Sequence, residues 1–200
     1  MAPPPAPSQA TRPRHSPLVR FIAMVLLALF TIVGLAVLIT WLSVKPKKLK
    51  YSIEQGSISG FNLTNNGHFN ANFHFVLRAN NPNKRVSIYY DRIEVTVSYE
   101  DQKLSINNVH PFYQRRHNVT YVDLNLAARD MSLYGGVARD LRLEKHSGNV
   151  ELDVKIRSKI RLKVGVFKIR RHLKIECGPL TVPFSSSKGK FERVSCDVDL

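Results

Sequence analysis

The feature that most limits what this chain can fold into is a stretch without a charged residue at positions 21–44. As an α-helix rising about 1.5 Å per residue, the stretch is roughly 36 Å long, enough to cross a bilayer core about 30 Å thick. A cleaved signal peptide is the alternative, but its apolar region is shorter, and no small-residue cleavage site precedes the lysines at 45–50. The stretch therefore predicts a single transmembrane helix.

The flanking residues leave the orientation of this helix open. The preceding segment, 1–20, holds six of the chain's eleven prolines and few apolar side chains, so it is predicted to be a disordered tail. Cations are almost equally frequent on the two sides: Arg12, Arg14 and Arg20 before the helix, and Lys45, Lys47, Lys48 and Lys50 after it. The usual excess of Lys and Arg on the cytosolic side therefore does not determine the orientation of this helix.

Two sequons and two cysteines favour an extracellular carboxyl-terminal domain. Asn62 and Asn118 each begin an Asn-x-Ser/Thr acceptor site for N-glycosylation. Cys177 and Cys196 fall in inward-facing positions of two strand-like segments, and a disulfide between them would stabilise the fold by ~3 kcal/mol in an oxidising compartment. We expect a cytosolic tail, a single pass through the plasma membrane and an extracellular domain.

Residues 61–200 are dominated by the apolar–polar alternation of strands with one buried face. The clearest runs lie at 69–79, 92–99, 122–126, 152–164 and 172–177. The only helical turn expected lies within 131–141, kept short by two adjacent glycines. We therefore predict an all-β fold, an antiparallel β-sandwich of the fibronectin type III kind. A basic juxtamembrane linker with the first strand, 45–60, connects it to the transmembrane helix.

The residues that usually carry catalysis or bind metals show no recognisable pattern. The seven histidines have no metal-ligand spacing, and no P-loop, dinucleotide fingerprint or nucleophile elbow is present. Asp197 and Asp199 spell the Asp-x-Asp of Golgi glycosyltransferases, but strand alternation explains them as two outward carboxylates, and no α/β pattern accompanies them. We expect no cofactor, no metal and no catalytic residues.

Cations concentrate in one predicted hairpin. Its first strand places five of them on one face at intervals of roughly 6.6 Å: Lys155, Arg157, Lys159, Arg161 and Lys163. Four more Lys or Arg follow at 168–174 without an intervening acid. Such a row either keeps an exposed strand soluble and monomeric or binds an anionic surface, such as lipid headgroups, demethylated pectin or an acidic partner. We do not expect nucleic acid, because exposed aromatic side chains are not interleaved with the cations.

Residues 80–91 read NNPNKRVSIYYD and resemble the signature of the plant NHL (harpin-induced-like) family. The folded part of that family is the late-embryogenesis-abundant type 2, or WHy, domain. The residues that carry the resemblance are Asn80, Asn81, Pro82, Asn83, Lys84, Ser87, Ile88, Tyr89, Tyr90 and Asp91. The similarity continues through 111–114, 163–165 and the cysteine pair. The motif itself either specifies a turn between two strands or presents a surface to a partner.

The resemblance implies a single-pass plasma-membrane protein whose extracellular β-sandwich acts, without enzymatic activity, in plant defence, the hypersensitive response and stress responses. Binding or signalling at the cell surface is the leading hypothesis, with a cell-wall polyanion, an anionic lipid or a defence receptor as partner. Structural protection of membranes against dehydration is the alternative. A Golgi glycosyltransferase-like enzyme is a third, weaker hypothesis.

Overall fold

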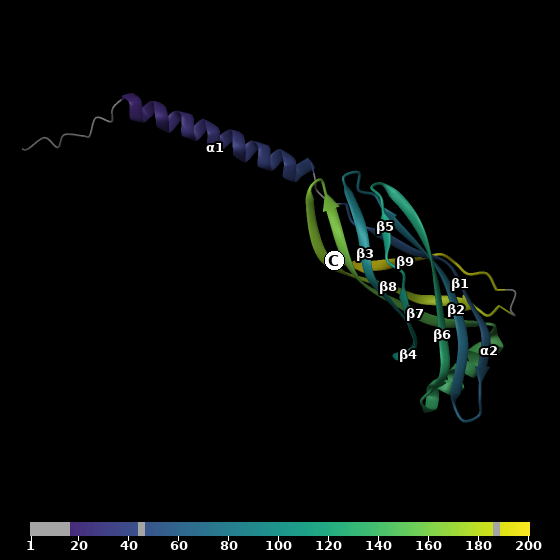
Figure 1. The fold of residues 1–200 in the computed structure, drawn as a ribbon. Helices are drawn as coiled ribbons and strands as arrows, with labels where there is room; N and C mark the ends of the chain where they lie inside the picture. The colour runs from purple at the N-terminus through teal and green to yellow at the C-terminus, as the bar shows by residue number, and fades with distance from the viewer. Residues whose placement is uncertain (1–16, 44–46, 186–188) are drawn as a thin grey trace, which may run out of the picture. The chain divides into compact units, whose positions relative to one another are not determined.

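A computed structural model describes residues 17–43, 47–185 and 189–200, which fall into two units divided between Lys45 and Pro46. The first unit contains helix α1 (Pro17–Ser43; Figure 1). Its segment Pro17–Ile39 has a mean hydropathy of 3.0, so the helix is long and apolar enough to cross a membrane.

The amino end of α1 differs from the predicted boundary. Residues 17–20, assigned above to the tail, form its first turn. Pro17 suits this position, because the first N–H groups of a helix have no intrahelical acceptor and proline has no N–H to leave unpaired. The rest of the predicted tail, 1–16, lies outside the described residues.

The described part of the second unit contains nine strands and helix α2 (Gly135–Ser147). The strands are β1 (Lys50–Leu63), β2 (His68–Asn81), β3 (Val86–Tyr99), β4 (Gln102–Val109), β5 (Phe112–Gln114), β6 (Asn118–Ser132), β7 (Asn149–Val164), β8 (Phe167–Pro183) and β9 (Val194–Asp199). All the pairs between these strands are antiparallel.

The strands form two layers that join through β9 (Figure 1). One layer contains β1, β2 and β6, and the other contains β3, β4, β5, β7 and β8, while β9 pairs with both β1 and β8. On the opposite side, Ser105 Oγ of β4 donates a hydrogen bond to Ala127 O of β6, at 2.8 Å. The predicted antiparallel sandwich after an apolar helix is therefore confirmed.

The core lies between the two layers and follows the predicted alternation. In β2, Phe69, Phe73 and Phe75 are each at most 2% exposed, and Val154, Ile156 and Ile160 of β7 face them from the other layer with similar burial. Burying each side chain of this size stabilises the fold by about 1.5–3 kcal/mol. The intervening residues point to solvent, so period-two alternation predicted the buried face of both strands.

The first strand, placed above in the linker segment 45–60, belongs to the sandwich. Tyr51, Ile53 and Ile58 of β1 are at most 4% exposed. Two register shifts, between Ile53 and Gln55 and between Ser59 and Asn62, interrupt the alternation of this strand. Since each bulge changes which side the following residues face, the period-two signal is lost over β1.

Helix α2 corrects the expectation of one short turn within 131–141. It begins at Gly135, so the glycine pair starts the helix, and it continues to Ser147. Gly148 ends it in a left-handed conformation (φ 88°), in which its N–H donates to Glu144 O and Lys145 O. Leu141 is 2% exposed and fixes the helix against the core. The many charged residues on its other face hide this short apolar stripe in the sequence.

Candidate functional site

The outer face of the β7–β8 hairpin carries the predicted row of cations. Its nine basic residues, called the basic face below, are Lys155, Arg157, Lys159, Arg161 and Lys163 of β7 and Lys168, Arg170, His172 and Lys174 of β8. Register places eight of them opposite one another in four pairs, for example Arg157 with Lys174 and Lys159 with His172, whereas Lys155 is opposite Glu176. All are exposed except Arg161, which is partly buried. The hairpin thus presents two adjacent rows of positive charge to solvent.

The cations of the basic face differ in how far they are neutralised. Arg161 Nε donates to Asp91 Oδ2 at 2.7 Å, and its Nη2 donates to Oδ1. These hydrogen bonds, followed by the charge of Asp91, raise the pKa of Arg161. The guanidinium also lies 5.4 Å from the centroid of the Tyr89 ring. Arg161 therefore holds β7 to β3 with its charge paired to that of Asp91, and its predicted role in binding an anionic surface stays a prediction.

At the other end of the face, Glu176 neutralises two lysines. Its Oε1 lies 2.9 Å from Lys174 Nζ and 3.8 Å from Lys155 Nζ. The hydrogen bond from Lys174, and then the charge of Lys174, lower the pKa of Glu176. Arg157, Lys159 and Lys163 form no ion pair with any described residue. Of the five predicted binding residues, these three retain their full charge toward solvent.

A shallow cleft of about 320 Å³ lies on this face. It is lined by Arg92, Glu94, Arg157, Ser158, Lys159, His172, Leu173 and Lys174. Arg92 and Glu94 come from β3, where a bulge between Tyr90 and Arg92 sets Arg92 opposite Lys159. Four side chains that carry positive charge and one carboxylate thus surround an open space in which a small anionic group fits. Sequence reasoning missed Arg92, because only the pairing of β3 with β7 brings it there.

The family-like motif at 80–91 forms a buried polar turn between β2 and β3. Asn81 is fully buried, and its Nδ2 donates to Val86 O (2.8 Å) and Arg115 O (3.1 Å). Its Oδ1 accepts from the backbone N–H and from the side chain of Asn83, both at 3.1 Å. Of the two interpretations left open above, the structure supports the turn.

The same turn holds the start of the folded domain. Asn83 Oδ1 accepts a 2.7 Å hydrogen bond from the backbone N–H of Lys47, and Asn83 Nδ2 donates to Lys47 O at 2.9 Å. The side-chain amide of Asn83 thus satisfies the N–H and the C=O of Lys47, as a neighbouring strand would do, just before β1 begins. The segment that follows the apolar helix is therefore fixed to the β2–β3 turn by one side chain.

Two tyrosines of the core form a buried hydrogen-bonded chain near this turn. Tyr90 Oη donates to Gln114 Oε1 at 3.1 Å, so the 2.6 Å contact between the two hydroxyls requires Tyr51 to donate to Tyr90. Gln114 Nε2 donates in turn to Ala79 O at 2.8 Å. Burial, the largest cause, raises the pKa of Tyr90 to about 12. This chain links β1, β3, β5 and β2 inside the core.

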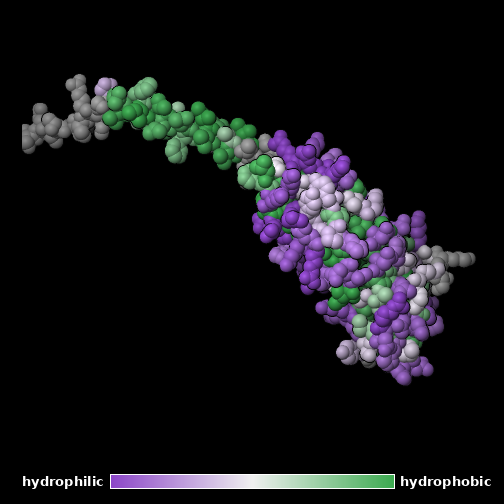
Figure 2. Space-filling view, in the orientation of Figure 1, coloured by the Kyte–Doolittle hydropathy of each residue, from purple (hydrophilic) through white to green (hydrophobic). Residues whose placement is uncertain are grey.

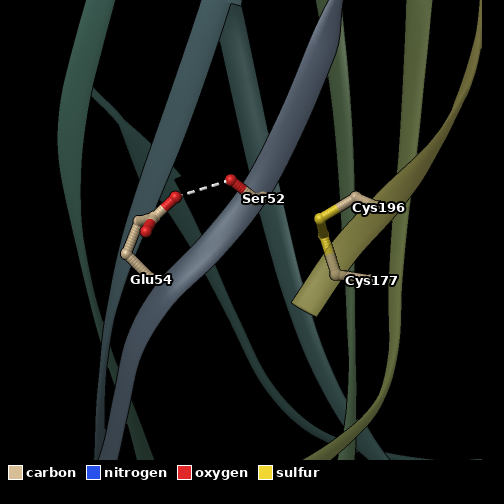
Figure 3. Close-up of a disulfide and its surroundings, with 4 residues drawn as sticks. All are labelled: Ser52, Glu54, Cys177 and Cys196. Atoms are coloured by element: carbon tan, nitrogen blue, oxygen red, sulfur yellow. Dashed lines mark hydrogen bonds between the residues drawn. A yellow bond between two sulfur atoms is a disulfide. The ribbon is translucent and has the colours of Figure 1, made fainter. Parts of the chain in front are cut away.

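Cys177 of β8 and Cys196 of β9 lie within bonding distance, with their sulfur atoms 2.06 Å and their Cα atoms 4.3 Å apart (Figure 3). Figure 3 also shows Ser52 of β1, whose hydroxyl donates to Glu54 at 2.7 Å. Since β9 pairs with both layers, this bond covalently closes the side of the sandwich where the layers join.

Both predicted glycosylation sites have exposed asparagines. Asn62 lies near the end of β1 and Asn118 at the start of β6, so they occupy opposite ends of the sandwich. Asp197 and Asp199 point outward from β9 opposite Glu176 and Lys174. Within the described residues, no group of three or more His, Cys, Asp or Glu side chains could hold a metal ion.

These features define a β-sandwich protein with a candidate membrane-spanning helix. The family model described as "Late embryogenesis abundant protein" matches residues 76–178. An uncharacterized protein of Arabidopsis thaliana is 38% identical, over 90% of this chain and 81% of its own length. NDR1/HIN1-like proteins 10 and 3 of the same plant are 32% and 37% identical, over 98% and 88% of this chain and 92% and 78% of theirs. The chain therefore belongs to the type 2 late embryogenesis abundant family, which includes the NDR1/HIN1-like proteins, and the predicted resemblance is confirmed.

Proposed function

We propose that this protein is a non-enzymatic binding module of plant stress and defence responses, anchored in the plasma membrane by α1 with its amino terminus in the cytosol. Its similarity to NDR1/HIN1-like proteins supports the association with defence. The apolar helix supports the anchor. The two exposed sequons and the cysteine pair support an extracellular domain, because glycosylation and stable disulfides belong to the secretory pathway.

The ligand of the module is a polyanion that binds the basic face. The observation that carries this proposal is the cleft in which Arg92, Arg157 and Lys159 converge without a matching number of carboxylates. Charges in a partly enclosed cleft focus the field and attract anions more strongly than scattered surface charges do. A demethylated pectin, with its repeated carboxylates, fits a row of cations outside a plant cell.

The test is binding of polygalacturonate to the full chain in phosphatidylcholine nanodiscs. Arg157→Glu combined with Lys159→Glu should weaken binding roughly tenfold or more, because each exposed charge contributes up to about 1 kcal/mol. A matched control reverses the exposed Arg129 and Arg139, outside the basic face, and changes the net charge equally. If both variants lose the same amount of polygalacturonate binding, net charge alone explains the loss and the basic face is not the site. Unchanged binding by the variant reversed at Arg157 and Lys159 would also refute the site.

The second candidate function is protection of membranes during dehydration, the alternative that the family resemblance allows. It predicts that the variant reversed at Arg157 and Lys159 protects dried vesicles from leakage as well as the unaltered protein does. If the protein is only a binding module, neither the unaltered protein nor this variant should protect the vesicles. We propose no catalytic role, and the glycosyltransferase hypothesis would be revived only by hydrolysis of a nucleotide sugar.

A further inference from the structure

The turn between β7 and β8 exposes large apolar side chains. Val166 is 87%, Phe167 71% and Ile169 44% exposed, whereas Leu173, farther along β8, is 2% exposed. Gly165 makes the tight turn with φ +58°. These three apolar residues, called the apolar tip below, lie within four positions of the chain, interrupted only by Lys168. Exposed apolar clusters of this kind mark surfaces that bind a partner or a membrane.

The apolar tip is exposed because the hairpin extends past the rest of the sandwich. Among the described strands, β8 pairs with β9 only over residues 174–176, so residues 167–172 of β8 pair with β7 alone. On their inner side Phe167 is opposite Val164 and Ile169 opposite Leu162, and both partners are only partly buried. Apolar and polar residues still alternate up to the turn of the hairpin. The apolar side chains there stay exposed because the second layer of the sandwich, which covers the same face farther along β7 and β8, does not extend to the turn.

Cations alternate with the apolar residues at this end of the hairpin. Lys163, Lys168, Arg170 and Arg171 are all exposed, and no acid occurs at 165–175. Figure 2 shows hydrophobic atoms at this end of the domain bordered by hydrophilic ones. Apolar side chains on one face of the hairpin end and cations on the other match a bilayer interface, where acyl chains lie beneath phosphate groups.

The chain's own anchor leads to the same end of the domain. The β7–β8 turn follows Val164, which pairs with Val86 at the start of β3. Val86 follows the β2–β3 turn, whose Asn83 holds Lys47. Residues 44–46 alone separate Lys47 from the last residue of α1, and four Cα–Cα steps of about 3.8 Å cannot exceed about 15 Å. A bilayer that α1 spans is therefore within reach of this end of the domain.

We propose that the apolar tip docks into the leaflet from which the domain emerges, with Phe167 and Val166 below the phosphate groups and the neighbouring cations on the headgroups. This inference rests on the proposal that α1 spans the membrane. Tethering makes the docking step intramolecular, with an effective concentration in the millimolar range for a short linker, so weak contacts suffice. Docking would hold the cleft lined by Arg92, Arg157 and Lys159 at a fixed height above the membrane.

The test uses tryptophan as a depth reporter in the full chain. Trp41, the only tryptophan, reports on α1 in the unaltered protein. In a Trp41→Phe background, Val166→Trp reports on the apolar tip. Leu143→Trp is the matched control, because Leu143 is 63% exposed on α2, which connects β6 and β7 at the opposite end of the sandwich. Each protein is reconstituted in vesicles of phosphatidylcholine and phosphatidylserine with brominated acyl chains.

Docking predicts that bromine quenches the reporters at 41 and 166 but not the one at 143. Lys163→Gln, Lys168→Gln and Arg170→Gln together should reduce the quenching at 166, because each cation near an anionic leaflet contributes about fivefold to binding. If the emission at 166 is solvent-like and unquenched while the emission at 41 is quenched, the docking is refuted and the membrane-spanning role of α1 is retained. A blue-shifted but unquenched emission at 166 would mean that protein, such as a second copy of the chain, covers the tip, which also overturns the proposal. Absence of quenching at 41 would refute the anchor and the docking that depends on it.

Discussion

Replacing Asn81 by aspartate should destabilise the folded domain strongly, because the amide is the centre of the β2–β3 turn. The substitution preserves shape and the two acceptor contacts from Asn83. It removes both N–H donors, so the carbonyl oxygens of Val86 and Arg115 lose their partner and face a carboxylate instead. Each lost hydrogen bond with an unsatisfied buried group costs about 1–3 kcal/mol, so Asn81→Asp should cost roughly 3–5 kcal/mol.

Thermal unfolding of the full chain in detergent, followed by circular dichroism, measures this loss. A domain of this size loses about 2–4 °C per kcal/mol, so the midpoint should fall by roughly 10 °C near neutral pH. Burial raises the pKa of the introduced carboxyl group above its unfolded value of about 4. The protonated form is therefore favoured in the fold, and the destabilisation should grow as the pH rises above about 4 and shrink in acid.

The neighbouring Asn80 provides the control, because it is only partly buried and its side chain makes no hydrogen bond with the described residues. Asn80→Asp introduces the same charge one residue away and should lower the midpoint by less than about 2 °C, as substitutions away from buried networks do. Equal shifts for the two variants, or a shift at Asn81 that does not depend on pH, would refute the role assigned to the buried amide.

Three further predictions concern covalent features and titration. Peptide mapping of unreduced protein should find Cys177 linked to Cys196, and replacing both with serine should cost about 3 kcal/mol; two alkylatable thiols in freshly isolated protein would contradict the pairing. Glycosidase treatment of protein expressed in a secretory membrane should increase its gel mobility unless both Asn62 and Asn118 are changed to Gln, and an unglycosylated protein would argue against an extracellular domain. The pKa of Tyr90 is raised to about 12 in the fold, so the free energy of unfolding should keep its full value below about pH 10 and fall by up to ~3 kcal/mol toward pH 12. Urea unfolding at increasing pH should show this decline, and Tyr90→Phe should reduce it.

Patterns that repeat within one element were readable without the structure. The uncharged stretch at 21–44 indicated a membrane-length helix, since length and hydropathy are properties of a single segment. The alternation along β2 and β7 predicted which side chains are buried, because successive strand residues point to opposite faces. Where the period breaks, the prediction was less complete: the first strand was expected within 45–60 but not its place in the core, because bulges interrupt the alternation of β1. The charged face of α2 hid a helix of 13 residues where one short turn was expected.

The sequence by itself therefore determined the apolar helix of membrane-spanning length, the all-β class and the row of cations on β7. Only the tertiary structure decided which cations remain available on β7, because strand pairing brings Asp91 of β3 to Arg161 and Glu176 of β8 to Lys155. Pairing likewise brought Arg92 into the cleft and left the end of the β7–β8 hairpin uncovered. The physical reason is that the face to which a side chain points depends on the local period of its own strand. The residues that it meets on the next strand depend on the register between distant segments, which no local pattern encodes.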